Sequence, residues 1–252
     1  MMLEHKKIQN LSDFFTELGK RREKGVYFYR INGYSEEIGK FLYDYYDAAR
    51  KCGVIIEGKI PNPTEGNLAY YYEMMGNDFQ LGMGFIMCSL KKWLPRMNDL
   101  QRQNVAESVY DSLDSMRKAG KTENMLKNAY IKFMCWLYYK FERIVNQLGE
   151  NNIPKILYEG NISSYELMLI SILSNAGCDV VFLQYEGDSG YLKSDPGSVL
   201  SDSLQMNGLG AFPQGYCIKK VRDEIQNEIN NERLYGTRPT ITNCTNAWIS
   251  TG

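Results

Sequence analysis

Polar and acidic side chains follow the apolar run KILYE in the second half of the chain. They lie before or within the first turn of the next amphipathic segment and are Gly160, Asn161, Ser163, Ser164 and Glu166. Backbone N–H groups and hydroxyls at the start of a helix are suited to binding an anion such as a phosphate. The local alternative is a capping box, because Ser163 and Glu166 have the spacing at which both side chains bind the helix's own backbone. Neither common glycine-rich nucleotide-binding motif occurs.

Two further groups of candidates stand where other apolar runs end. Arg30, Asn32 and Gly33 close the first run, and Arg30 could pair with a phosphate or carboxylate of a ligand. Its alternative is a structural ion pair. Glu186 and Asp188 follow the run VVFLQY. A carboxylate after a strand can bind ribose hydroxyls or a metal, although acidic and glycine residues also simply form turns. Ligands of open α/β sheets bind beyond the carboxyl ends of the strands, so these side chains are expected to contribute to one ligand site.

The composition excludes several classes of chemistry. The one histidine, His5, lies in a polar N-terminal segment, so histidine-based zinc sites and catalytic triads are not expected. The six cysteines show no C-x-x-C spacing and are interpreted as buried free thiols of a reducing compartment. A net charge of −1 gives no general attraction to nucleic acid, and no apolar stretch reaches the roughly 18 residues that span a membrane. No metal is predicted, no cofactor is identified, and a cytoplasmic location is expected.

Two stretches of similar plan must position the candidates. The first has an apolar strand at 26–31, a helix that Ser35 caps and Gly53 ends, and a second apolar strand at 54–58. The second, KILYEGNISSYELMLISILSNAGCDVVFLQYEG, has the same order of strand, turn, serine cap, amphipathic helix, glycine and strand. Near-continuous apolar strands are typical of a parallel sheet that is covered on both faces. The sequence therefore predicts an α/β fold, with a Rossmann-like parallel sheet from two βαβ units.

A large helical insertion separates the two units. It begins with an apolar, methionine-rich segment, and its third helix is predicted to run from Thr122 to Gly149. A short helix is expected at 10–24, and a polar helix at 221–234 follows a long turn-rich stretch. The expected parts are a first unit with its N-terminal helix, the insertion, and a second unit with a long loop and the C-terminal segment. They correspond to residues 1–65, 66–150 and 151–252.

The third helix of the insertion carries its own candidates. Lys132 and Arg143 are eleven residues apart and therefore share a face of one helix, either as a solvated stripe or as the wall of a cleft. Cys135 lies between Met134 and Trp136. An apolar setting raises the pKa of a thiol, so Cys135 is predicted to be inert.

The chain also resembles a known family. KTENMLKNAYIKFMCWLYYKF, the stretch that begins at IPKILYEG, and RINGY near the start resemble the YceG-like bacterial family. Members of that family are described as components of a biosynthetic module and are linked to bacterial tellurite-resistance and general-stress gene clusters. They are generally longer, so the resemblance implies that this chain corresponds to an N-terminal portion. The resemblance implies no catalytic residue.

Three functional hypotheses remain open. The first is a component of a stress- or tellurite-associated biosynthetic system that binds an anionic or nucleotide-like metabolite. The second is a glycosyltransferase-like or nucleotide-dependent transferase in which Glu166, Glu186 or Asp188 supplies carboxylate chemistry. The third is a non-catalytic adaptor that binds a partner protein through the segment MGNDFQLGMGFIM, since methionine suits adaptable interfaces. An enzyme predicts a concave pocket at the strand ends, and an adaptor predicts a large exposed apolar patch.

Overall fold

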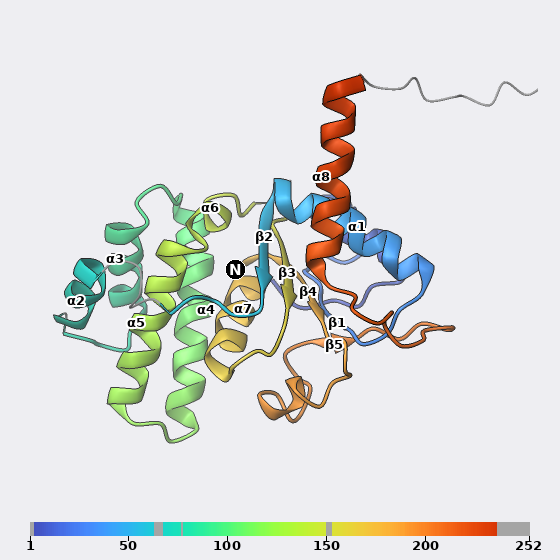
Figure 1. The fold of residues 1–252 in the computed structure, drawn as a ribbon. Coiled ribbons are helices and arrows are strands. Elements are labelled where there is room, and N and C mark those ends of the chain that lie inside the picture. The colour runs from blue at the N-terminus through green and yellow to red at the C-terminus, as the bar shows by residue number, and fades with distance from the viewer. Residues whose placement is uncertain (1–2, 63–67, 77, 150–152, 236–252) are drawn as a thin grey trace, which may run out of the picture.

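A single parallel sheet forms the centre of the molecule (Figure 1). The structure is a computed structural model that describes residues 3–62, 68–76, 78–149 and 153–235. Five strands pair in the order β2-β3-β4-β1-β5, and each of these pairings is parallel. Their bounds are Phe28–Ile31 for β1, Gly53–Glu57 for β2, Lys155–Glu159 for β3, Asp179–Leu183 for β4 and Asp202–Ser203 for β5. The predicted α/β class is therefore confirmed.

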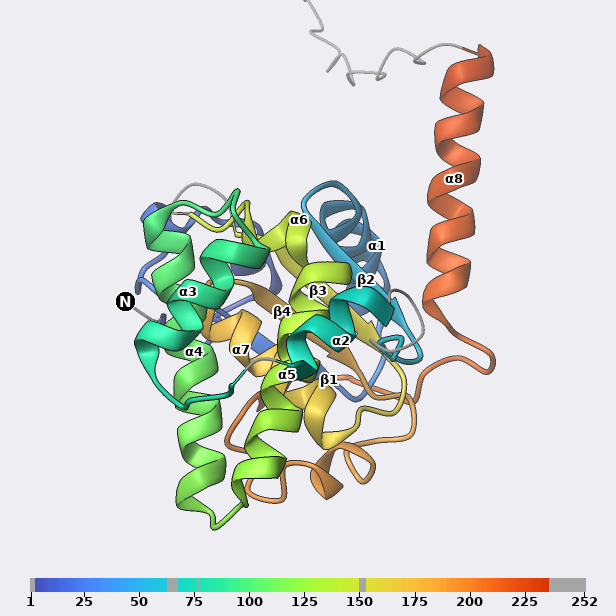
Figure 2. The ribbon, with the colours of Figure 1, turned by 90° about the vertical axis from the view of Figure 1, so that its left-hand side faces the viewer.

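The two predicted units interleave within this sheet. Helix α1, Glu36–Lys51, connects β1 to β2, and helix α7, Ser164–Ala176, connects β3 to β4. The two strands of the second unit lie side by side and separate the two strands of the first. The two connections run in opposite directions along the sheet. Right-handed crossovers therefore place α1 on one face and α7 on the other (Figure 1, Figure 2).

Alternate residues of the strands contribute to two separate cores. Leu157 and Val181 pack with α1, whereas their neighbours Ile156 and Val180 pack with α7 and the helical insertion. All four side chains are buried. The near-continuous apolar sequence of the strands thus reflects burial on both faces, because each face is covered by helices.

The helical insertion forms a layer over the α7 side of the sheet (Figure 2). Helix α4 packs along α7 and also contacts α3 and α5. The ends of α4 follow local signals, since Asn98 forms a capping box with Gln101 and Gly120 follows the last turn at φ +79°. The bounds of the layer are Leu68–Gly76 for α2, Met83–Trp93 for α3, Asp99–Lys118 for α4, Glu123–Tyr139 for α5 and Glu142–Val145 for α6.

Two predicted helices are wrong in extent. The helix predicted to continue to Gly149 ends at Tyr139, and α6 is a separate turn. Phe141 between them is fully buried, because the chain bends there into the core while the apolar spacing continues unbroken. The helix expected at 10–24 is instead two 3-10 turns, η1 at Leu11–Phe15 and η2 at Leu18–Lys20.

The predicted end of α1 is confirmed, since the helix ends at Lys51, but Gly53 has a different role from that of a helix stop. Gly53 does not end α1 in a left-handed conformation but begins β2. A Cβ atom on Gly53 would lie 1.9 Å from the carbonyl oxygen of Lys155, so the close approach of β3 requires a glycine. The strand β5 was not predicted, because its two residues lie within the turn-rich stretch and pair in parallel with β1.

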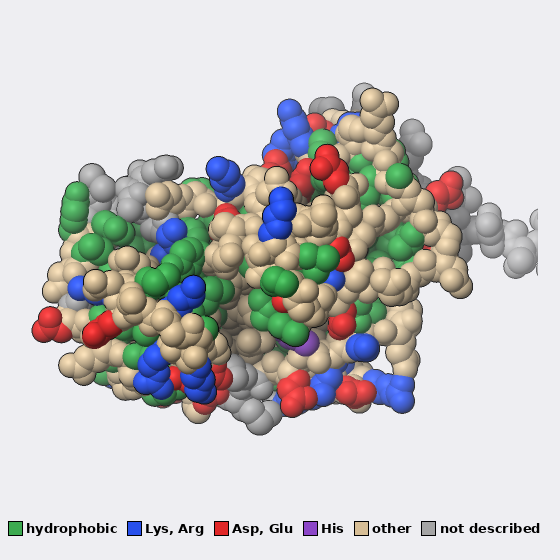
Figure 3. Space-filling view, turned by 90° about the horizontal axis from the view of Figure 1, so that it is seen from below, with side chains coloured by type: hydrophobic (Ala, Val, Ile, Leu, Met, Phe, Trp, Pro, Cys, Tyr) green, Lys and Arg blue, Asp and Glu red, His purple; other side chains and the backbone are tan. Residues whose placement is uncertain are grey.

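Helix α8, Ile218–Tyr235, leaves the body of the molecule (Figure 1, Figure 2). Its first turns pack on the α1 side through Ile218, Val221 and Ile225, and its later turns project away. The predicted polar helix is confirmed with an earlier start, and predictions for residues 236–252 lie outside the described residues. Across the described ranges, no helix is both long and apolar enough to cross a membrane. On the face drawn in Figure 3, basic and acidic side chains are interspersed.

Candidate functional site

In the turn between β3 and α7, the hydrogen-bonding groups of Ser163 and Glu166 bind each other. The Ser163 hydroxyl accepts a hydrogen bond from the Glu166 N–H at 3.4 Å, and the Glu166 carboxylate accepts from the Ser163 N–H at 2.9 Å. The other oxygen of this buried carboxylate accepts from the Ile60 N–H at 2.7 Å. A carboxylate therefore occupies the place where an anion would bind, and the geometry favours the capping-box alternative.

The other residues of that turn lie at its surface or shape its backbone. Gly160 has φ +121°, and a Cβ atom there would lie 2.8 Å from the carbonyl oxygen of Gly58. Asn161 and Ser164 are exposed, and the Ser164 hydroxyl lies 3.5 Å from that of Ser194. A ligand role for these residues stays a prediction.

Arg30 is buried and bound on all sides by the loop that follows β4. Its guanidinium makes a two-point contact with the Asp188 carboxylate, at 3.0 and 3.1 Å. Its remaining donors reach the Ser198 hydroxyl and both the hydroxyl and the carbonyl of Ser201, at 2.7 to 2.8 Å. The Tyr191 ring lies 4.3 Å from the guanidinium carbon. Because all five N–H donors of Arg30 have protein partners, the geometry favours the structural ion pair.

The remaining predicted residues are divided between surface and interior. Glu186 is exposed. Gly33 lets the chain pass Leu209 and Gly210, whose atoms would lie 3.0 Å from a Cβ. The Asn32 amide donates to the Ser203 hydroxyl at 3.0 Å, while its buried Oδ1 has no hydrogen-bond partner. The predicted residues thus form two contact pairs, Arg30 with Asp188 and Ser163 with Glu166, and within the described ranges no hydrogen bond or ion pair joins them.

The candidates of the insertion are also resolved. Lys132 and Arg143 do not share a helix face, because they lie on α5 and α6. Lys132 stacks over the rings of Trp136 and Tyr165, at 5.3 and 5.0 Å. Arg143 donates to the carbonyls of Lys51, at the end of α1, and Gly53, at the start of β2. Burial raises the pKa of Cys135 to about 12, as its apolar neighbours indicated, and the inertness of the thiol stays a prediction.

Glu159 is a carboxylate at a strand end that the sequence reasoning missed. It ends β3, is half-buried, and accepts a hydrogen bond at 2.8 Å from the Ile218 N–H, where α8 begins. Burial raises the pKa of Glu159. The hydroxyl of Tyr185, which follows β4, lies near Glu159 and opposes part of this rise in the pKa. That buried hydroxyl forms no hydrogen bond of normal geometry. The argument applied to Glu186 and Asp188 would also have selected Glu159.

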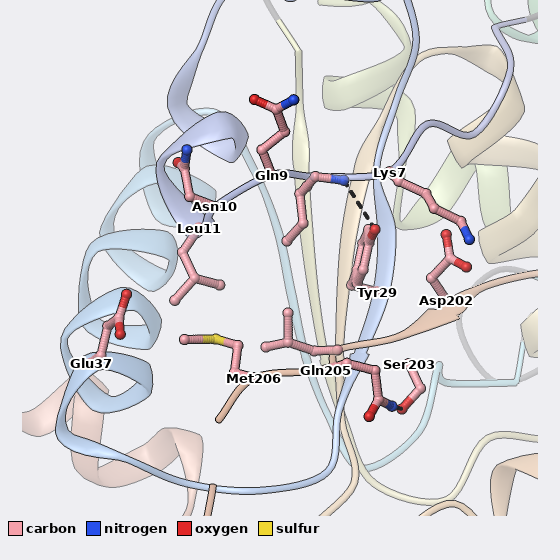
Figure 4. A pocket seen from close by; sticks show the side chains of 12 residues that line it. Lys7, Gln9, Asn10, Leu11, Tyr29, Glu37, Asp202, Ser203, Gln205 and Met206 are labelled. Atoms are coloured by element: carbon pink, nitrogen blue, oxygen red, sulfur yellow. Dashed lines mark hydrogen bonds between the residues drawn. The ribbon is translucent and has the colours of Figure 1, made fainter. Parts of the chain in front are cut away.

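A pocket lies at the β5 edge of the sheet (Figure 4). Its volume is about 410 Å³, within the usual range for small-molecule sites. Four segments meet there: the N-terminal segment, β1, the first turn of α1, and β5 with the residues after it. The lining residues are Lys7, Ile8, Gln9, Asn10, Leu11, Tyr29, Glu37, Asp202, Ser203, Leu204, Gln205 and Met206.

Polar groups in this pocket face one another across an apolar floor (Figure 4). Lys7 and Asp202 extend toward each other on one side, Glu37 lies on the other, and Leu11 and Met206 lie between them. The Tyr29 hydroxyl accepts a hydrogen bond at 3.0 Å from the N–H of Ile8, which fixes the N-terminal segment over β1. The arrangement can bind a small molecule that has both an apolar surface and several hydrogen-bonding groups.

None of the twelve lining residues was predicted as a site residue. Their segments are local fragments without a motif, and they meet only because β5 pairs with β1 and the N-terminal segment crosses that edge. Within the described residues, no group of three or more His, Cys, Asp or Glu side chains could hold a metal ion.

The comparison with family models gives one finding. Residues 6–226 match the model of the YceG domain, a range that contains every strand and the whole pocket of Figure 4. No curated protein and no solved structure matches the chain. Because the match covers most of its length, the chain belongs to the YceG domain family.

Proposed function

We propose that this protein binds a small polar metabolite in the pocket of Figure 4, as a component of a bacterial biosynthetic system of the stress- or tellurite-associated type. The observation that carries the binding proposal is a cavity of about 410 Å³ in which polar groups from four segments face one another over apolar side chains. Membership of the YceG domain family supports the biosynthetic context, which the sequence resemblance implies.

The charges of the pocket narrow the class of ligand. Lys7 is the one cation among its lining residues, and Asp202 and Glu37 are the two carboxylates. A net negative lining repels a polyphosphate and attracts hydrogen-bond donors or an amino group. The pocket therefore fits a neutral or zwitterionic molecule, such as a nucleoside, a sugar or an amino acid, better than it fits a free nucleotide. An anionic or nucleotide-like metabolite remains the wider proposal from the sequence.

A transferase is a second candidate because of Glu159. Two of the carboxylates proposed for catalysis already have structural partners: Glu166 binds the α7 cap, and Asp188 binds Arg30. Glu159 also has a structural partner, the Ile218 N–H, but it combines partial burial, a raised pKa and a position at the carboxyl end of β3. Such a carboxylate is a candidate general acid or base.

The structure gives the adaptor hypothesis less support. In the methionine-rich segment, Ile86 is buried, and Met83, Phe85 and Met87 pack partly buried against the core. Their apolar surface is therefore largely used within the fold, and binding of a partner protein through this segment remains a weaker proposal.

The binding proposal is tested by thermal-shift and calorimetric titration of the purified chain with nucleosides, nucleotide-sugars, sugars and amino acids. A ligand at about 100 times its Kd should stabilise the fold by about 2.7 kcal/mol. Asp202→Asn keeps the size of the side chain and removes its charge, so it should lose most of that stabilisation. Asp44→Asn changes an exposed carboxylate of α1 outside the pocket and is the matched control. Equal ligand shifts in both variants would exclude this pocket as the site.

A further inference from the structure

A second cavity, of about 250 Å³, lies beside the first. Lys7 and Gln9 line both cavities, so the two adjoin. The lining of the second cavity is net positive, unlike that of the first, because it contains five cationic side chains and only two carboxylates. The lining residues are Lys6, Lys7, Gln9, Asp13, Thr16, Lys20, Arg21, Arg22, Glu23 and Tyr27.

A buried ionic cluster lies behind one wall residue of this second cavity, Arg21, which is the one member of the cluster that lines it. The Arg21 guanidinium binds the Asp179 carboxylate, and the Lys155 ammonium reaches the same carboxylate at 3.1 Å. Arg21 and Asp179 have fully buried side chains, and that of Lys155 is 10% exposed. Two cations thus share one carboxylate in the interior, and among the described residues no second carboxylate pairs with either of them. An excess of positive charge in a low-dielectric interior is unfavourable, and an anion in the cavity would offset it.

The rim of the cavity adds two cations, Arg22 and Lys7, of which Lys7 also extends toward Asp202 in the neighbouring pocket (Figure 4). Within the described part of the chain, no ion pair involves Lys7 or Arg22, and both side chains belong to exposed residues. The Asp13 carboxylate is already used, since it accepts hydrogen bonds from the N–H groups of Gln9 and Asn10. Glu23 pairs with Lys6 at 3.6 Å and is the one carboxylate of the lining that opposes an anion from the rim.

We infer that this second cavity is an anion site for a phosphate-type group, which Arg22 and Lys7 at its rim would contact and the positive charge of Arg21 would attract. The Arg21 guanidinium itself is buried and donates to the carbonyls of Thr16 and Gly25 and to Asp179. The site goes beyond the proposed function and does not depend on it. Arginine and lysine are the side chains that bind phosphate through charge-assisted hydrogen bonds. The position is separate from the start of α7, where Glu166 already occupies the helix terminus.

The test is a titration of the whole chain with inorganic phosphate and pyrophosphate at low ionic strength, followed by calorimetry and thermal shift. Arg22→Ser should weaken pyrophosphate binding about fivefold or more, as expected for the loss of one charge-assisted hydrogen bond. Glu23→Gln should strengthen binding by about twofold, because it removes the opposing carboxylate. Lys24→Ser is the matched control, since it changes the charge of the same segment by the same amount outside the cavity lining.

The pattern across the three variants decides the inference. Weaker binding in Arg22→Ser, stronger binding in Glu23→Gln and little change in Lys24→Ser support a built anion site. An equal loss in Arg22→Ser and Lys24→Ser would overturn it, because the effect would then be that of net charge alone. Absence of any binding of pyrophosphate at millimolar concentration to the folded chain would also overturn it. Neither outcome bears on the pocket of Figure 4, whose test uses uncharged or zwitterionic ligands.

Discussion

The turns that lead into α1 and α7 share a sequence plan but have different surroundings. In each, a serine hydroxyl at the N-cap accepts a hydrogen bond from the N–H three residues later, from Ile38 to Ser35 and from Glu166 to Ser163. In α7 the third residue is an acid whose carboxylate returns to the cap. In α1 it is a buried isoleucine, and the acids of the first turn, Glu36 and Glu37, face outward.

This difference decides which turn is open to a ligand. The α7 turn is closed by its capping box and by a further bond to Ile60, so its polar groups have few donors or acceptors left. The α1 turn contributes Glu37 to the pocket of Figure 4. A motif at a helix start therefore indicates a ligand site only where the side chains of that turn do not already bind the N–H groups of the helix. The following variants test this contrast.

The largest effect is expected for Arg30, which holds the loop beyond β4 closed beside the second unit. Arg30→Met keeps much of the volume but leaves Asp188 without its partner, so the free energy of unfolding should fall by about 3 kcal/mol. Urea denaturation measures the change. Arg50→Met, which removes an exposed ion pair with Asp47, should stay within about 1 kcal/mol of the parent chain. A small loss of stability for Arg30→Met together with lost ligand binding would instead place Arg30 in a ligand site.

The two caps should differ when each serine is removed. Ser35→Ala should lower the free energy of unfolding by about 1 kcal/mol, the usual value for an N-cap. Ser163→Ala should cost nearer 2 kcal/mol, because the Glu166 carboxylate also loses a hydroxyl donor at 2.6 Å in a buried position. Chemical denaturation of both variants gives the comparison. Equal losses of unfolding free energy in the two variants would mean that Glu166 adds nothing to the N-cap of α7.

The two acids of the α1 turn separate a pocket role from a helix role. Glu36→Gln and Glu37→Gln each remove one negative charge from the first turn, so they should change stability equally and slightly. Only Glu37 lines the pocket, so Glu37→Gln alone should weaken a pocket ligand, by about two- to fivefold. Calorimetry with a ligand found in the screen measures this ratio. A similar effect of both substitutions would remove α1 from the binding site.

The smallest expected effect is a pH dependence of the contact between the N-terminal segment and α7. His5 lies 3.0 Å from the Ser174 hydroxyl, and burial lowers its pKa below 6.5, opposed in part by the charge of Asp202. The folded state then binds fewer protons than the unfolded state. The contribution of neutral His5 to stability is therefore fully present above about pH 6.5. It is lost as the pH falls from there toward the lowered pKa of His5 in the folded state.

The single histidine makes this effect measurable. NMR titration of the His5 ring should give a pKa below that of a free histidine, and denaturation between pH 5 and 7 should show the loss of stability. In His5→Phe, the component of the pH dependence in this window should disappear. An unshifted ring pKa would show that the N-terminal segment is not packed against α7.

Local signals predicted much of the fold because the groups involved lie within four residues of one another. The caps at Ser35 and Ser163 and the apolar strands all follow from such neighbours. The break between α5 and α6 could not be predicted in this way, since the apolar spacing continues through buried Phe141. Gly53 was misread for a related reason: its role depends on the approach of Lys155, which is far away in the sequence.

The sequence by itself determined the α/β class, the serine caps and the buried, apolar setting of Cys135, because alternation, spacing and immediate neighbours decide these features. Only the tertiary structure decided which polar groups are available to a ligand. Arg30 meets Asp188 across 158 positions, and the pocket of Figure 4 needs β5 beside β1. In the sequence, a side chain that is available to a ligand cannot be distinguished from one that binds another part of the protein. The difference lies in the partners that folding brings to it.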